Sequence, residues 1–127
     1  MTKKMRDGLD EQQKKKREEI LHILFLNMSL CHLKKNKPQD AIKAATDSLE
    51  FNKENPKAYY RLAIAQKQNG DLDAAKENFV KAIKLAPSDV NLRNEYKQLT
   101  DFKATKESQW YSKMSGFLHS EKMAKIE

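Results

Sequence analysis

The chain has 127 residues, of which 39% are apolar and 34% charged, with three glycines and three prolines. This length allows one compact domain and is too short for two of ordinary size. Sandwiches and barrels need a turn about every eight to twelve residues, so the scarcity of turn residues excludes them. An all-α fold built from long helices is predicted.

The sequence has neither a membrane-spanning segment nor a signal peptide, and it has a single cysteine. No run of eighteen apolar residues could span a bilayer, and the first nineteen residues are too charged for the apolar core of a signal peptide. A cytoplasmic protein is therefore expected, with the nucleus as a second location and no membrane partner. The one cysteine, Cys31, has apolar neighbours that predict a small buried side chain.

The net charge of +7 raises the question of acidic partners. Acids alternate with the Lys and Arg residues through most of the chain, whereas nucleic-acid-binding chains usually concentrate their cations along one stripe. Nucleic acid is therefore not expected as a partner. The exception is a run of four cations, Lys14 to Arg17, which is interpreted as a solvated helix start or connector.

Residues 1–19 are expected to form a charged connector or a helix extension. The next segment, 20–33, is apolar nearly all round, which is typical of a helix contacted on several sides. Residues 1–19 contain almost no apolar residues that could cover it, so the chain is interpreted as a fragment that lacks a preceding repeat. A homodimer, or a swapped or extended helix, is expected to bury the uncovered face.

Residues 20–87 contain a degenerate repeat of thirty-four residues, in which Ala41 aligns with Ala75 and Leu49 with Ile83. Two helical hairpins are predicted, at about 22–55 and 56–89. In the second hairpin, Gly70 is expected in the left-handed cap and Asp71 as the N-cap of the next helix.

Residues 88–127 are expected to form a long C-terminal capping helix and tail. Pro87-Ser88-Asp89 ends the second hairpin and caps this helix, whose first part should cover the open end of the stack. Its apolar residues recur every three to eight positions, at Leu92, Tyr96, Leu99, Phe102, Trp110, Met114 and Phe117.

The second hairpin resembles the tetratricopeptide repeat, because aromatic, small and turn residues stand at that family's spacing: Tyr59, Leu62, Ala63, Gly70, Ala75, Phe79, Ala82 and Pro87. The stretch 22–55 is similar to a more degenerate repeat of the same family, with Pro38 opening its second helix. The resemblance implies a helical-hairpin solenoid, in which first helices line a concave groove.

In that groove, Lys57 and Arg61 lie one turn apart and can reach the same ligand group. Asn27 lies at the corresponding height in the preceding repeat, so an amide, an ammonium and a guanidinium are expected to converge. A carboxylate accepts several charge-assisted hydrogen bonds, each worth about 1.5–3 kcal/mol, so the three donors suit a terminal carboxylate or an Asp side chain.

FLNMSLCHLKK, KAYYRLAIAQ and WYSKMSGF are similar to the domain that follows the isomerase domain of FKBP-type and cyclophilin-type immunophilins. The resemblance implies a co-chaperone whose carboxylate clamp binds the C-terminal Glu-Glu-Val-Asp of a ninety-kilodalton heat-shock chaperone. Asn27, Lys57 and Arg61 match three of the five clamp residues, and Lys34 matches a flanking basic contact. The other two, a Lys and an Asn, have no counterpart, and each loss would weaken binding roughly tenfold to a hundredfold.

Leu26, Leu30, Tyr60 and Ile64 are expected to line the same groove, with core packing as the alternative for all four and as an equal alternative for Leu26 and Ile64. No nucleophile with a base, metal cluster or phosphate loop occurs in the sequence, so no enzyme, cofactor or metal is expected in this chain. The resemblance implies a larger peptidyl-prolyl isomerase with its catalytic domain upstream.

Two other functions stay open. The terminal helix is basic and aromatic and could bind calmodulin through Lys103, Lys106, Trp110, Tyr111, Lys113, Met114, Phe117 and Leu118, although Asp101, Glu107 and Glu121 weaken this interpretation. Alternatively, the groove binds an unrelated internal peptide and never a free C-terminus.

Overall fold

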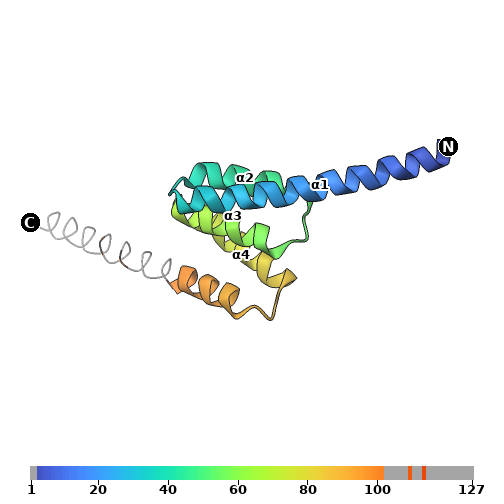
Figure 1. Cartoon of the computed structure of the whole chain (residues 1–127). Helices are drawn as coiled ribbons and strands as arrows, with labels where there is room; N and C mark the ends of the chain where they lie inside the picture. The colour runs from blue at the N-terminus through green and yellow to red at the C-terminus, as the bar shows by residue number, and fades with distance from the viewer. Residues whose placement is uncertain (1–2, 102–108, 110–112, 114–127) are drawn as a thin grey trace, which may run out of the picture.

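The computed structural model describes residues 3–101, 109 and 113. Within them the chain is all-α, as predicted, and has no strand. Short turns join the helices in the order α1 (Lys3–Lys34), α2 (Pro38–Phe51), α3 (Pro56–Gln68) and α4 (Leu72–Leu85), and a further helix at residues 90–101 follows (Figure 1). α1 packs on α2, α3 packs on α4, and the two hairpins stack through α2 and α3, with a smaller contact of α1 with α3.

The second hairpin closes with a Schellman turn centred on Gly70, which has a φ of 86°. The N–H of Gly70 donates to the carbonyl of Lys67 at 3.1 Å, and that of Asp71 donates to Gln66 at 2.8 Å. Gly70 therefore has the left-handed conformation that the sequence predicts. Asp71 does occupy the N-cap position of α4, but its side chain makes no capping bond and accepts instead from Asn69 at 2.9 Å.

The first hairpin closes with the same turn, thirty-four residues earlier. Asn36 has a φ of 57° and takes the place of Gly70. Its N–H donates to Leu33 at 3.1 Å, and the N–H of Lys37 donates to His32 at 2.9 Å. Asparagine is one of the few residues that tolerate this conformation, so the two turns are equivalent although their sequences differ.

A buried network around His22 joins α1 to α2 and to the start of α3. His22 Nδ1 lies 2.9 Å from the carbonyl oxygen of Ser48 and 2.9 Å from its hydroxyl, which donates to the His22 carbonyl at 3.1 Å. On the other side of the ring, Asn55 Nδ2 lies 2.9 Å from Nε2. Asn55 is also the N-cap of α3, and its Oδ1 accepts from the N–H of Lys57 at 3.0 Å. The network therefore fixes the start of α3 relative to α1 and α2.

Small residues form the helix crossings, so that neighbouring helices approach closely. Ala63 and Ala75 are fully buried with Phe79, as the periodicity predicts, and Tyr60 packs edge-on against the Phe79 ring at a centroid distance of 6.1 Å. The helix at 90–101 adds Leu99, which is 1% exposed, to this cluster. This helix therefore covers the outer side of the second hairpin.

One face of α1 stays uncovered by any described element. Its large apolar side chains are widely exposed: Ile20 by 65%, Leu24 by 50%, Ile23 by 48% and Met28 by 39%. Cys31 lies on the same face and is exposed, so the prediction of a buried thiol is wrong: its apolar neighbours do not enclose it. The N-terminal turns of α1 project beyond the body (Figure 1). No helix within the described residues is long and apolar enough to cross a membrane.

Candidate functional site

A pocket of about 590 Å³ lies where α1 and α3 face the start of the helix at 90–101. Such a volume is within the usual range for sites that hold small molecules or short peptide segments. Its wall combines cations, apolar side chains and two polar residues, namely Leu30, Leu33, Lys34, Pro56, Lys57, Tyr60, Arg61, Ile64, Asp89, Asn91 and Leu92. Six of the eight site residues expected from the sequence are among them.

Lys57 and Arg61 lie on the same face of α3, one turn apart. Their place in the pocket is set by the start of α3, where Asn55 caps the helix and Pro56 is its first residue. A proline at this position already has the backbone angle that the helix needs. The side chain of Lys57 is exposed, and no ion pair of Lys57 is found among the described residues.

Arg61 connects α3 to α1. Its Nη1 donates to the carbonyl oxygen of Leu26 at 2.6 Å, and the Ser29 hydroxyl donates to the same oxygen at 2.6 Å. Partial burial lowers the pKa of the Arg61 guanidinium, since desolvation penalises its charge. A guanidinium has five N–H donors, and no carboxylate pairs with this one within the described part of the chain. Arg61 is thus held in place and retains donors for an anion.

Asn27 and Leu26 differ in placement from the other expected site residues. Asn27 is exposed and is not part of the pocket wall. It lies one turn before Leu30 and two turns before Lys34, so it continues their line along α1 beyond the enclosed part. Leu26 is 6% exposed and belongs to the core, so its expected role as a groove residue is replaced by core packing. Its contribution to the site is the backbone oxygen that accepts from Arg61.

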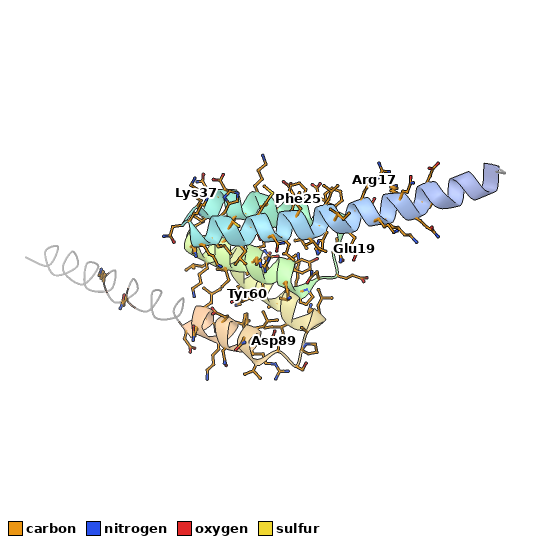
Figure 2. All side chains as sticks on the ribbon, viewed as in Figure 1. Arg17, Glu19, Phe25, Lys37, Tyr60 and Asp89 are labelled. Atoms are coloured by element: carbon orange, nitrogen blue, oxygen red, sulfur yellow. The ribbon has the colours of Figure 1, made fainter. Side chains whose placement is uncertain are left out.

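The sequence does not predict the residues that form the far wall of the pocket. Asp89 caps the helix at 90–101 by accepting from the N–H groups of Asn91 at 3.0 Å and Leu92 at 3.4 Å, and all three residues line the pocket. Figure 2 labels Asp89, which lies directly before this helix, and Tyr60, which lies on the neighbouring α3. The Pro87-Ser88-Asp89 motif marks the cap in the sequence, but only the path of the turn brings it to the pocket.

Burial raises the pKa of the Tyr60 hydroxyl, and the negative charges of Glu95 and then Asp89 raise it further. Tyr60 is therefore a neutral, polar-tipped part of the pocket wall. The residues expected to bind calmodulin lie outside the described part of the chain, except Lys113, and this function stays a prediction.

The comparisons with known proteins agree with this fold. Residues 56–89 match the tetratricopeptide repeat family. Heat shock protein STI1 of Saccharomyces cerevisiae is 37% identical over 67 residues, which are 53% of this chain and 11% of the yeast protein. Peptidyl-prolyl cis-trans isomerase FKBP42 of Arabidopsis thaliana is 34% identical over 76 residues, which are 60% of this chain and 21% of that protein. The chain thus spans only a small part of both relatives.

Among solved structures, the C-terminal TPR-containing domain of a putative FK506-binding protein of Plasmodium falciparum is 34% identical. It has a TM-score of 0.66 over 74% of this chain and 61% of that chain. The first TPR of Spaghetti (RPAP3), bound to the HSP90 peptide SRMEEVD, has a TM-score of 0.63 at 22% identity over 65% of this chain and 68% of its own.

The second TPR domain of human RPAP3, in complex with the HSP70 peptide SGPTIEEVD, has a TM-score of 0.61 at 23% identity over 77% of this chain and 91% of its own. At such identities the likeness to the two RPAP3 domains shows the fold alone. The sequence match, the equivalent turns and the structural likeness lead to one assignment. Residues 56–89 are a tetratricopeptide repeat, and the described helices around them have the fold of the TPR-containing domain of the Plasmodium falciparum FK506-binding protein.

Proposed function

We propose that this chain is a protein-interaction module that binds the acidic C-terminus of a chaperone through a carboxylate clamp. The observation that carries the proposal is the meeting of Lys34, Lys57 and Arg61 in one pocket with an apolar lining. Neither Lys57 nor Arg61 has a carboxylate partner among the described residues. A bound carboxylate would supply the missing negative charge.

We propose a terminal carboxylate, and not a single side-chain acid, as the bound group. Both have two oxygens that accept several hydrogen bonds, but the residues that precede a chain end also bring apolar side chains and further acids to the rest of the pocket. Lys57 and Arg61 would hold the terminal group, Lys34 would meet an upstream acid, and Leu30, Tyr60 and Ile64 would contact the Val or Met side chain. Asn27 would donate its amide to the peptide where the groove continues along α1.

Two structurally similar domains suggest which protein supplies this acidic C-terminus. Two RPAP3 domains of the same fold bind HSP90 and HSP70 peptides, and both peptides end in Glu-Glu-Val-Asp. We therefore propose the Glu-Glu-Val-Asp end of a ninety-kilodalton heat-shock chaperone as the ligand. The similarity to an FK506-binding protein and to FKBP42 supports a larger peptidyl-prolyl isomerase as the parent protein, with its catalytic domain outside this chain.

Isothermal titration of the chain with a peptide that ends in Met-Glu-Glu-Val-Asp tests the proposal. The same peptide with an amidated C-terminus separates a clamp from a groove for internal peptides, because amidation removes the terminal charge. We expect the free acid to bind and the amide to bind at least about tenfold more weakly, the effect of one lost charge-assisted bond. Equal binding of the two peptides would show recognition of an internal segment instead.

Matched substitutions locate the contact. Lys57→Ala should weaken binding of the free acid about tenfold. Lys43→Ala removes the same charge from an exposed position on α2, outside the pocket, and should leave binding unchanged. Asn27→Ala tests whether the groove continues along α1. A loss of affinity for the free acid would support Asn27 as a clamp residue, and unchanged affinity would show that Asn27 does not contact the peptide.

Self-association is a second property that a specific observation favours. Ile20, Ile23, Leu24 and Met28 form an apolar stripe on one face of α1, beside the exposed Asn27, and each is at least 39% exposed. Contiguous exposed apolar patches usually mark interaction surfaces. We propose that a second copy of the chain, or a swapped helix, covers this face.

A further inference from the structure

The pocket carries charges of opposite sign on different walls. Lys34, Lys57 and Arg61 belong to α1 and α3, whereas Asp89 belongs to the turn that leads into the helix at 90–101. Apart from Asn91, the rest of the lining is apolar or aromatic. A ligand that fills the pocket therefore meets cations on one wall and a carboxylate on another.

The charge of Asp89 is available to a ligand. Its Oδ1 accepts two backbone N–H groups, from Asn91 and Leu92, which are neutral donors. No Lys or Arg pairs with it within the described residues, in contrast to Glu95, whose Oε2 lies 3.7 Å from Lys67 Nζ. The negative charge of Asp89 also acts inside the pocket, where it contributes to the raised pKa of the Tyr60 hydroxyl.

We infer that the site selects acidic C-terminal peptides that carry an arginine or lysine shortly N-terminal to the acidic end, and that Asp89 is the residue that selects them. The inference rests on the proposed function, because a peptide whose terminal carboxylate meets Lys57 and Arg61 fills the rest of the pocket with its preceding residues and passes Asp89. Like charges at this wall would repel, so an upstream acid is disfavoured there.

The two chaperone peptides introduced above differ in this feature. SRMEEVD has an arginine immediately before its Met-Glu-Glu-Val-Asp end, whereas SGPTIEEVD has no basic residue. The inference therefore predicts a preference for the HSP90-type end. The effect is modest, about threefold, because Asp89 is exposed and because the positive end of the helix dipole lies beside it.

Titration of the whole chain with three free-acid peptides, SRMEEVD, SAMEEVD and SEMEEVD, tests the charge preference. We expect the change from arginine to alanine to weaken binding about threefold and the change to glutamate to weaken it further. Raising the salt concentration should bring the three affinities together, since it screens exposed charges.

Asp89→Asn provides the decisive comparison, because asparagine keeps the oxygen that caps the helix and loses the charge. In this variant the ratio of the SRMEEVD and SAMEEVD affinities should fall to about one. Asp71→Asn makes the same charge change at the exposed start of α4, outside the pocket, and should keep the parent ratio.

The outcomes separate the inference from the proposed function. Binding that needs the free carboxylate, with a ratio that Asp89→Asn leaves unchanged, overturns the inference alone. A parent ratio of one does the same. If no peptide binds, or if amidated SRMEEVD binds as tightly as the free acid, the proposed function fails and the inference fails with it.

Discussion

Arg61 on α3 donates a hydrogen bond of 2.6 Å to the backbone oxygen of Leu26 on α1, thirty-five residues earlier. The guanidinium therefore supports the stacking of the hairpins and also lines the candidate binding pocket. Lys57, one turn earlier, lines the pocket and makes no such contact with any described residue. The two cations should respond differently to substitution.

Arg61→Ala is expected to lower the free energy of unfolding by about 1 kcal/mol, through the lost hydrogen bond, and to weaken peptide binding as well. Lys57→Ala should weaken binding and change stability by less than about 0.5 kcal/mol, since its side chain is exposed. Urea unfolding and peptide titration of both variants check this. Equal stability of the two variants would show that the bond to Leu26 contributes nothing in solution.

His22 is expected to be the neutral tautomer with its proton on Nδ1. Asn55 accepts from Lys57 through Oδ1, so its Nδ2 donors face Nε2 of His22, and Nε2 must accept. Nδ1–H then donates to the Ser48 oxygens. Long-range proton–nitrogen correlation spectra at neutral pH identify the tautomer. A proton on Nε2 would contradict the network.

Removing the His22 imidazole tests how much the same network contributes to the free energy of unfolding. His22→Ala should cost about 2–3 kcal/mol of unfolding free energy, because Asn55 and Ser48 would lose partners in a buried region. His32→Ala is a suitable comparison on the same helix, since the buried Nδ1 of His32 has no hydrogen-bond partner among the described residues. It should cost less than His22→Ala in the same urea experiment.

The two glycines of the described chain should respond oppositely to alanine. Gly70 has a φ of 86°, where any side chain is strained, although a Cβ added there would meet nothing within 4 Å. Gly70→Ala should therefore destabilise the protein by about 1–2 kcal/mol. Gly8 lies in α1, and a Cβ added there would also meet nothing within 4 Å. Gly8→Ala should therefore stabilise the helix by about 1 kcal/mol, the difference in helix propensity between the two residues. Thermal unfolding followed by circular dichroism measures both changes.

The ionisation of the Tyr60 hydroxyl is expected to lower the stability of the fold at alkaline pH. Its pKa is raised above 10.0 by burial and by the charges of Glu95 and Asp89, so the folded state favours the neutral phenol. This contribution is fully present below pH 10 and is lost as the pH rises through the higher folded-state pKa. Above pH 10, the Tm of the parent should therefore fall more steeply than that of Tyr60→Phe. Parallel curves would contradict the assignment.

The open face of α1 predicts concentration-dependent association. Sedimentation at micromolar concentrations should show species larger than a monomer, and Leu24→Glu should shift them towards the monomer, because it places a charge in the apolar stripe. Leu85→Glu changes a leucine of similar exposure, 43%, at the end of α4 and should leave association unchanged. A clean monomer of the parent at all these concentrations would refute the proposed self-association.

The sequence by itself determined the local features of this protein. Apolar periodicity predicted the helices of both hairpins, Gly70 and Pro38 marked where helices end and begin, and the spacing of Lys57 and Arg61 put two cations on one helix face. These properties depend on residues within one or two turns of each other, so a one-dimensional pattern is enough to specify them.

Only the tertiary structure decided which side of α1 is covered. Successive residues on a helix are turned by about 100°, so Leu26 is buried while its neighbour Asn27 is exposed. No described helix packs against the side of α1 that carries Cys31, so the thiol is exposed although its neighbours in the sequence are apolar. Asp89 joins the pocket through the fold of a turn far along the chain, since contacts between distant elements depend on how whole helices stack.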